Sequence, residues 1–201
     1  MKNKRVDKIF SIILLIIFVA IGVLVRNTHE GLRIDLKILE ILHININPGV
    51  FKIMDFISFI GSPKFLIPVI TMVTIYTLYK KRYFISKLLI ASSLGSWILN
   101  YILKFIFNRS RPFDYFLVEQ GGLSYPSGHS MVSMSMYLTI AYLLIKYKNT
   151  NRKLAYTIAT LLVFIMGISR LYLGVHWPTD VIGGFIMGYL YYRYCINAIK
   201  K

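Results

Sequence analysis

The chain has 201 residues, 56% of them hydrophobic and 16% charged, and its formal net charge at pH 7 is +16. This length suits one domain, so residues 1–201 are treated as a single unit. The long apolar runs that recur along the chain exclude an ordinary soluble protein and predict an integral membrane protein. Cys195 is the only cysteine, which excludes an internal disulfide and a cysteine-based metal site.

The N-terminal segment is predicted to be a membrane-spanning helix. Four cations within residues 2–8 precede the apolar run 9–25, a pattern that a secretory signal peptide shares. No small-x-small cleavage site follows, because residues 23–26 read Val-Leu-Val-Arg. We therefore expect an uncleaved helix whose N-terminus is cytoplasmic.

The loop 27–50 contains one amphipathic segment, over residues 30–42. Leu32, Leu36 and Leu39 lie largely on one face of a helix there, opposite a charged face made of Glu30, Arg33, Lys37 and Glu40. Such a helix either lies in the outer interfacial plane of the membrane or is a connector held against the bundle. Both interpretations stay open from the sequence. Asn47-Pro48-Gly49 ends the segment.

Six further apolar segments follow, and five of them are predicted to span the membrane. Together with the first helix they make a predicted all-α polytopic bundle of six transmembrane helices. Residues 51–60 form a helix too short to span, which Gly61-Ser62-Pro63 ends. The remaining spans are expected at residues 65–79, 84–107, 129–145, 154–168 and 181–198. Ser96, Asn100 and Lys104 recur every four residues, so they form a polar stripe at the outer end of the third span.

The charges are unevenly divided between the two sides of this arrangement. Fifteen of the 24 Lys and Arg lie on the side of the two termini, with only one of the eight acids, Asp7. An excess of Lys and Arg marks the cytoplasmic side of a membrane protein. The net charge of +16 is therefore a topology signal, and we expect no nucleic-acid partner.

Three polar clusters lie at the outer ends of the predicted helices, where zigzag spans bring them to one surface. They are Lys104 with Arg111-Pro112, then Pro126-Ser127-Gly128-His129, and then the stretch 169–180, which contains Ser169, Arg170, His176 and Asp180. Polar groups are costly in hydrocarbon, so charged residues at the ends of apolar helices indicate function.

The residue types in these clusters suit phosphoryl transfer. A carboxylate near an imidazole, as in His176 and Asp180, fixes the tautomer and activates the far nitrogen. Ser127 is a good N-cap, and Gly128 leaves backbone N–H groups open to an anion. His129 is placed to protonate a leaving alkoxide. Three neighbouring cations, Lys104, Arg111 and Arg170, repel one another unless a multiply charged anion such as phosphate is bound.

The order and spacing of the clusters resemble the type 2 phosphatidic acid phosphatase (PAP2) family, a superfamily that also includes the vanadium haloperoxidases. The pattern of that family is Lys-x6-Arg-Pro, Pro-Ser-Gly-His and Ser-Arg-x5-His-x3-Asp, and every defining position is matched between residues 104 and 180. The resemblance implies the bacterial membrane lipid phosphatase branch. The chain departs from larger relatives in one respect: no large soluble insertion covers the proposed site.

The resemblance implies roles that agree with the chemistry of the residues. His176 would be the nucleophile, Asp180 would orient it, and His129 would be the general acid. The phosphate oxygens would be held by Lys104, Arg111, Ser127, Gly128 and Arg170. No metal and no cofactor are expected. The substrate would be a lipid phosphate monoester or pyrophosphate, namely phosphatidylglycerophosphate, phosphatidic acid or undecaprenyl pyrophosphate in a bacterium.

The expected location is the cell membrane, with cytoplasmic termini and the active site on the outer face. Two alternatives are a vanadate-dependent haloperoxidase, whose relatives are soluble, and a non-catalytic lipid-phosphate binding or transport protein, which would not need two histidines. Outside the clusters, Lys64 and Arg109 are expected to extend to the interface. His29 and His43 are expected to be solvated and to have no chemical role.

Overall fold

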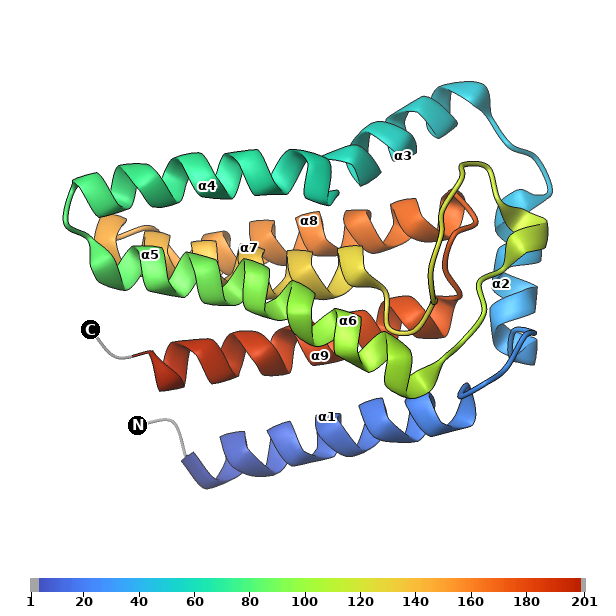
Figure 1. The fold of residues 1–201 in the computed structure, drawn as a ribbon, viewed down its shortest axis with the longest axis horizontal. Helices are drawn as coiled ribbons and strands as arrows, with labels where there is room; N and C mark the ends of the chain where they lie inside the picture. The colour runs from blue at the N-terminus through green and yellow to red at the C-terminus, as the bar shows by residue number, and fades with distance from the viewer. Residues whose placement is uncertain (1–3, 200–201) are drawn as a thin grey trace.

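The structure, a computed structural model, describes residues 4–199 and is helical throughout its regular elements (Figure 1). Three of the fifteen cations assigned to the cytoplasmic side, Lys2, Lys200 and Lys201, lie outside this range. The elements are α1 (Lys4–Leu24), α2 (Arg33–His43), α3 (Pro48–Ile60), α4 (Pro63–Tyr79), α5 (Tyr83–Ile90), the π-helical turn η1 (Ala91–Gly95), α6 (Ser96–Phe107), the 3₁₀ turn η2 (Phe113–Tyr115), α7 (Gly128–Lys148), α8 (Arg152–Tyr172) and α9 (Pro178–Ala198).

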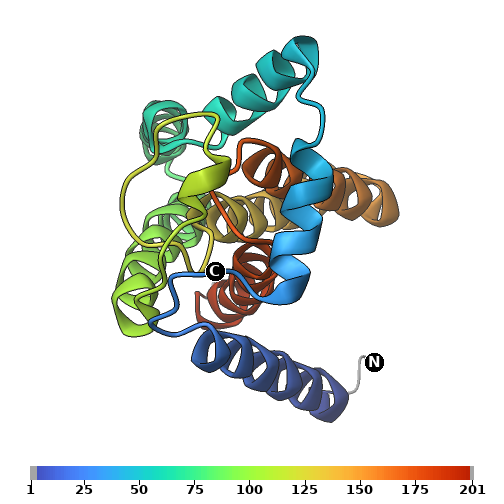
Figure 2. The same ribbon diagram turned by 90° about the vertical axis from the view of Figure 1, so that its right-hand side faces the viewer.

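Helix α7 forms the centre of the bundle and packs against α8, α9, α6 and α5. Helix α1 packs against α9, and α4 packs against α5. The start of α1 and the end of α9 lie at the same end of the bundle (Figure 1). At the opposite end lie α2 and the loop 108–127, and Figure 2 looks onto this end.

Four helical segments are long and apolar enough to cross a membrane: α1, the continuous segment 83–107 formed by α5, η1 and α6, α7, and α8. Helices α3 and α4 pass the same test as a pair bent by 42°. The expected short helix before the second span is therefore confirmed, with the break at Gly61-Ser62. Helix α9 has the length of a span, 21 residues, but its Gly and Tyr content makes it less apolar than the others.

Local sequence explains where the helices begin and end. Asn47 was expected to end the amphipathic segment, and it also starts α3, because its side chain accepts hydrogen bonds from the N–H groups of Gly49 and Val50. Asn151 caps α8 in the same way. Asn108 and Asn149 end α6 and α7 in the left-handed conformation, with φ of 47° and 50°.

Helix α2 lies across the outer end of α8 and α9 (Figure 2). Asp35 and Leu39, four residues apart, form its buried side, and neither side chain is exposed. The amphipathic segment is therefore held against the bundle, and its position relative to the membrane interface stays a prediction.

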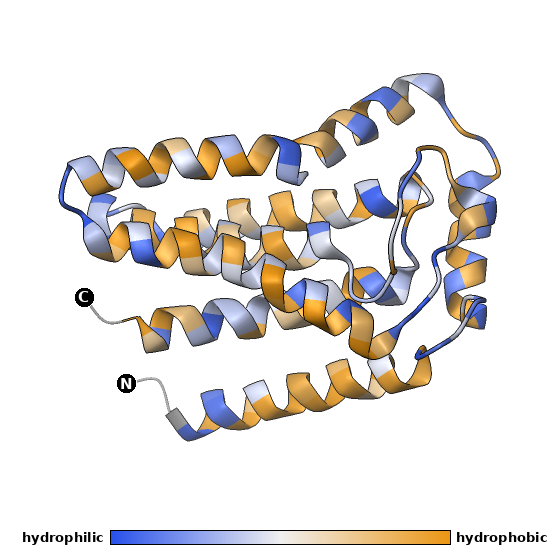
Figure 3. Ribbon diagram, in the orientation of Figure 1, coloured by the Kyte–Doolittle hydropathy of each residue, from blue (hydrophilic) through white to orange (hydrophobic). Residues whose placement is uncertain are grey.

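Hydrophobic residues predominate along most of the helices, whereas hydrophilic residues gather at several helix ends and in the loops (Figure 3). Ile16, Ile67 and Phe105 are each more than 60% exposed, on α1, α4 and α6. Large apolar side chains in this position need an apolar solvent, and lipid tails supply it.

Candidate active site

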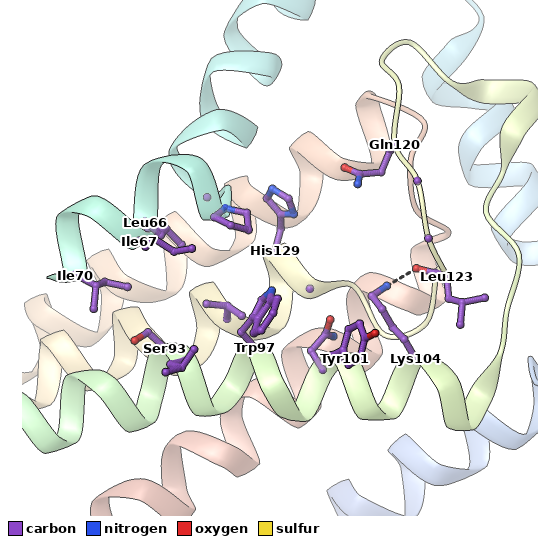
Figure 4. A pocket seen from close by; sticks show the side chains of 18 of the residues that line it. Leu66, Ile67, Ile70, Ser93, Trp97, Tyr101, Lys104, Gln120, Leu123 and His129 are labelled. Atoms are coloured by element: carbon purple, nitrogen blue, oxygen red, sulfur yellow. Dashed lines mark hydrogen bonds between the residues drawn. The ribbon is translucent and has the colours of Figure 1, made fainter.

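A cavity of about 760 Å³ opens between α4 and α6, with α7 as its floor (Figure 4). Most of its wall is apolar. Residues of the three predicted clusters meet at the end of the cavity beside the loop 108–127: Lys104, Arg111, Gly128, His129 and His176. The structure therefore brings together residues that are more than 70 positions apart in the sequence.

His176 lies in the tight turn between α8 and α9. Gly174 makes this turn possible, because its φ is +70° and an added Cβ would lie 1.8 Å from the carbonyl oxygen of Tyr115. Nδ1 of His176 lies 3.3 Å from Oδ2 of Asp180, the third residue of α9. The same carboxylate oxygen accepts hydrogen bonds from the N–H of Trp177 and from the hydroxyl of Ser124. Both His176 and Asp180 are buried.

The other ring nitrogen of His176 faces a cation. Nη1 of Arg111 lies 3.2 Å from Nε2 of His176 and donates to the carbonyl oxygen of Val175 at 2.6 Å. A guanidinium can only donate, so Nε2 must carry a lone pair and the ring proton must be on Nδ1, directed toward Asp180. The contacts thus favour the tautomer in which Nε2 carries the lone pair.

The surroundings favour the neutral form of His176. Burial lowers the pKa of His176 well below its ordinary value, and the positive charges of Arg111, Lys104 and Arg170 lower it further. Burial also lowers the pKa of Arg111, to about 10. This value is still well above neutral pH, and the guanidinium therefore remains charged.

In the polar stripe of the third span, Ser96 and Asn100 are buried and Lys104 is half-buried, and Asn100 and Lys104 line the cavity. Nζ of Lys104 donates to the carbonyl oxygens of Leu123 and Ser124, so it holds the loop that precedes α7 (Figure 4). Nδ2 of Asn100 donates to the carbonyl oxygen of Pro126 at 3.0 Å. An added Cβ on Gly128 would lie 2.9 Å from Oδ1 of Asn100, so only glycine fits here without displacement.

The start of α7 has the predicted cap. Ser127 precedes the helix, and its Oγ accepts a hydrogen bond from the N–H of Ser130. Ser127 is fully buried, whereas the neighbouring Gly128 and His129 line the cavity. The ring of His129 also contacts the end of α3, where an added Cβ on Gly61 would lie 3.3 Å from Cδ2 of His129.

Arg170 lies behind the cavity wall, near the end of α8. Nη1 of Arg170 donates to the hydroxyl of Ser58 on α3, and Nη2 donates to Oε1 of Gln120 at 2.8 Å. Its Nε is buried and has no hydrogen-bond partner among the residues that the structure describes. The loop residue Gln120 therefore closes the outer end of the cavity over a guanidinium that still has a donor to offer.

Sequence reasoning missed several residues of this centre. Arg109 was expected to extend to the interface; instead it is fully buried, because its guanidinium bridges Asp35 and Asp180. Ser124, which contacts both Asp180 and His176, and Gln120 were also not identified. The one signal available for Asp35 was its position four residues before Leu39 on the apolar side of α2.

Comparison with known proteins identifies the family of the chain. The protein is a multi-pass membrane protein with several candidate transmembrane helices. The family model of the PAP2 superfamily matches residues 85–201, and the chain belongs to this family. It is 36% identical over 146 residues to phosphatidylglycerophosphatase B of Bacillus subtilis, covering 71% of this chain and 72% of that protein. It is 25% identical over 189 residues to an undecaprenyl-diphosphatase of Sulfolobus acidocaldarius, covering 90% and 87%.

Solved structures show the same architecture. The crystal structure of a transmembrane PAP2 type phosphatidylglycerolphosphate phosphatase from Bacillus subtilis superposes with a TM-score of 0.85 at 30% identity, over 95% of this chain and 98% of that chain. LpxE of Aquifex aeolicus gives a TM-score of 0.68 at 21% identity, over 84% and 98%, which shows a shared fold.

Proposed function

We propose that this protein is a membrane lipid phosphatase that hydrolyses a phosphate monoester or pyrophosphate of a lipid through a phosphohistidine at His176. The observation that carries the proposal is the buried His176, which faces Asp180 through Nδ1 and Arg111 through Nε2 at the head of an apolar cavity. A neutral imidazole with its lone pair beside a phosphate-binding guanidinium is placed for attack on phosphorus.

The first step transfers the phosphoryl group to the enzyme. Nε2 of His176 forms a bond to phosphorus while the bond from phosphorus to the lipid oxygen breaks. His129, which lines the same cavity, donates a proton to the leaving oxygen. The imidazole of His176 gains positive charge in this step, and the carboxylate of Asp180 at Nδ1 stabilises it.

The second step releases inorganic phosphate. Water attacks the phosphorus, the bond from phosphorus to Nε2 breaks, and His129 takes a proton from the water. His176 returns to its neutral state. Neither step requires a metal ion or a cofactor, because the two histidines supply the nucleophile and the proton transfers.

The phosphate oxygens are assigned to the cationic groups and to the start of α7. Lys104 and Arg111 line the cavity, and Arg170 retains a buried donor that is free among the described residues. Ser127 and Gly128 lie at the N-terminus of α7, where the helix dipole and unpaired N–H groups favour an anion. A phosphate dianion would offset the repulsion among the three cations.

The lipid tail is assigned to the space between α4 and α6. Ile67, Ile75, Trp97, Tyr101 and Phe105 line the cavity and are also about half or more exposed on the outside of the bundle. The cavity therefore opens sideways through a wall that faces hydrocarbon. A lipid can place its headgroup at His176 while its tails remain in the bilayer.

We assign six spans by adding the bent α3–α4 pair and α9 to the four apolar segments. Six spans put both termini on one side of the membrane. The excess of Lys and Arg assigns that side to the cytoplasm, and the site then lies at the outer face. Helix α9 runs the length of α7 and belongs to the same layer of the bundle, which supports its inclusion despite its polar residues (Figure 1).

Within this class we favour phosphatidylglycerophosphate as substrate, ahead of phosphatidic acid and undecaprenyl pyrophosphate. The support is the likeness to a phosphatidylglycerophosphatase B at 36% identity and to a phosphatidylglycerolphosphate phosphatase structure at a TM-score of 0.85. The corresponding undecaprenyl-diphosphatase match is 25% identical.

The test is phosphate release by the purified full-length protein in mixed micelles with each of the three lipids at equal surface concentration. We expect the highest kcat/KM with phosphatidylglycerophosphate and no release by His176→Ala. Highest kcat/KM with undecaprenyl pyrophosphate would change the substrate assignment, whereas no release from any lipid by the wild type would contradict the phosphatase function itself.

A further inference from the structure

A buried charge network lies directly behind the His176–Asp180 pair. Nη1 of Arg109 donates to Oδ1 of Asp180 at 2.7 Å, and Nη2 of Arg109 donates to Oδ2 of Asp35 at 2.7 Å. The side chains of Arg109, Asp35 and Asp180 are all 0% exposed. Arg109 lies two residues before Arg111, in the variable part of the first cluster, and Asp35 lies on α2 outside all three clusters.

Asp35 also holds the first turn of α9, the helix that carries Asp180. Oδ1 of Asp35 accepts a hydrogen bond from the N–H of Thr179 at 2.9 Å, and Oδ2 contacts the hydroxyl of Thr179 at 2.9 Å. Nη1 of Arg109 donates to the same hydroxyl at 2.7 Å. Helix α2 thus supplies a capping carboxylate to another helix, in the place where α9 has unpaired N–H groups.

The sum of charges in this network bears on His176. Oδ1 of Asp180 accepts a hydrogen bond from Arg109, and Oδ2 of Asp180 faces Nδ1 of His176. If Arg109 and Asp180 were alone, their charges would cancel and His176 would have a neutral pair behind it. Asp35 adds a second negative charge, so the network retains one net negative charge behind the imidazole.

Within residues 4–199, the other charged or titratable groups that face His176 are positive or neutral. Arg111 comes from the loop 108–127, Lys104 from α6, His129 from α7 and Arg170 from α8. Asp180 from α9, with Arg109 and Asp35 behind it, is therefore the negative side of the site among the residues described. Its charge is what stabilises the imidazole when Nε2 bonds to phosphorus and the ring becomes cationic.

We propose that Asp35 and Arg109 are positioning residues that set the charge and orientation of Asp180 and, through Asp180, the basicity of His176. The proposal rests on the proposed function, because it assigns these residues to the nucleophile of that reaction. Arg109 fixes the carboxylate by holding Oδ1, and Asp35 prevents Arg109 from neutralising it. Helix α2 is then a part of the active-site framework and more than a connector.

The test compares two pairs of variants that differ only in the charge of residue 35. The first pair is wild type and Asp35→Asn, and the second is Arg109→Gln and the double variant Asp35→Asn/Arg109→Gln. The readouts are the titration midpoint of His176, measured by NMR on full-length protein labelled at its four histidines, and the kcat and KM for the lipid substrate. Glu40→Gln, the same kind of change at an exposed position of α2, is the matched control.

We expect the loss of the charge on Asp35 to move the His176 midpoint to lower pH in both pairs, while Glu40→Gln leaves it unchanged. Asp35→Asn should lower kcat by roughly 10- to 100-fold with little change in KM, by analogy with the loss of the carboxylates that orient metal-binding histidines. The double variant should recover much of that kcat, because its Asp180 again carries an uncancelled charge. A purely structural role would reduce the yield of folded protein without moving the midpoint.

Equal His176 midpoints within each pair would overturn the proposal. If Asp35→Asn does not accumulate as folded protein, the comparison of Arg109→Gln with the double variant tests the proposal alone. The double variant removes both charges and so leaves no unpaired buried cation. These outcomes are separate from the phosphatase function: the midpoint is measured without substrate, and loss of the function appears as absence of phosphate release by the wild type.

Discussion

Nη1 of Arg111 lies 3.2 Å from Nε2 of His176, on the opposite side of the ring from Asp180. A phosphate oxygen that binds to this guanidinium brings its phosphorus next to the nitrogen that carries the lone pair. In the proposed mechanism, Arg111 and His176 are therefore in contact before substrate arrives, which reduces the reorganisation that the reaction requires.

The pH behaviour of His176 follows from its surroundings. Burial and the cations Arg111, Lys104 and Arg170 lower its pKa, so the ring should lose its proton below the ordinary value of about 6.5 and be a competent nucleophile at neutral pH. Inorganic phosphate should raise the pKa, because an anion then faces the ring. An NMR titration of the labelled histidines with and without phosphate measures both; a midpoint above about 6.5 in the phosphate-free protein would contradict the account.

The two histidines should respond differently to the leaving group. Loss of the general acid in His129→Ala should reduce turnover of a lipid substrate by roughly 10²- to 10⁴-fold. p-Nitrophenyl phosphate has a leaving group that needs no proton, so it should recover much of this loss in His129→Ala and none in His176→Ala. Equal recovery in both variants, measured as kcat with the two substrates, would show that the roles are wrongly divided.

The chemistry should be independent of divalent metal ions. In the proposed mechanism the nucleophile and the acid are histidines, and the positive charge around the phosphate comes from Lys104, Arg111 and Arg170. Activity should therefore persist in excess EDTA, and orthovanadate, which adopts the five-coordinate geometry of phosphorus in the transition state, should inhibit in competition with substrate. Loss of activity in EDTA with recovery on adding Mg²⁺ would point to a metal-dependent reaction.

The orientation in the membrane can be tested with single cysteines. Cys195 is buried, so Cys195→Ser provides a background, and Glu119 and Lys81 are exposed at opposite ends of the bundle. In intact cells an impermeant maleimide should label Glu119→Cys and not Lys81→Cys. The reverse pattern would invert the assignment that the positive charges support.

Much of this site could be predicted from the sequence because its groups lie at short, fixed spacings. Four-residue spacing places Asn100 and Lys104 on one face of α6, and the same spacing across a turn brings His176 to Asp180. Arg109 could not be placed in this way, since its partners Asp35 and Asp180 are more than 70 residues from it and only tertiary packing brings them together. Without those partners, an arginine at a helix end is expected at the interface.

The same limit applied to the helices. Apolar runs predicted α1, α7 and α8 closely, because a long hydrophobic stretch indicates a membrane-spanning helix without reference to distant residues. The role of α2 was left open because its amphipathic pattern suits a membrane interface and a protein surface equally. Its contact with the bundle is visible only in the structure, where Asp35 and Leu39 are buried and α2 packs against α8 and α9.

The central claim is that His176 becomes covalently bonded to phosphorus. Rapid acid-free quenching of the wild-type protein with ³²P-labelled substrate, followed by peptide mapping under alkaline conditions, tests it directly. The account predicts an acid-labile phosphohistidine on the peptide that contains residue 176, present in His129→Ala and absent in His176→Ala. A phosphohistidine at residue 129, or turnover with no labelled enzyme at any quench time, would contradict it.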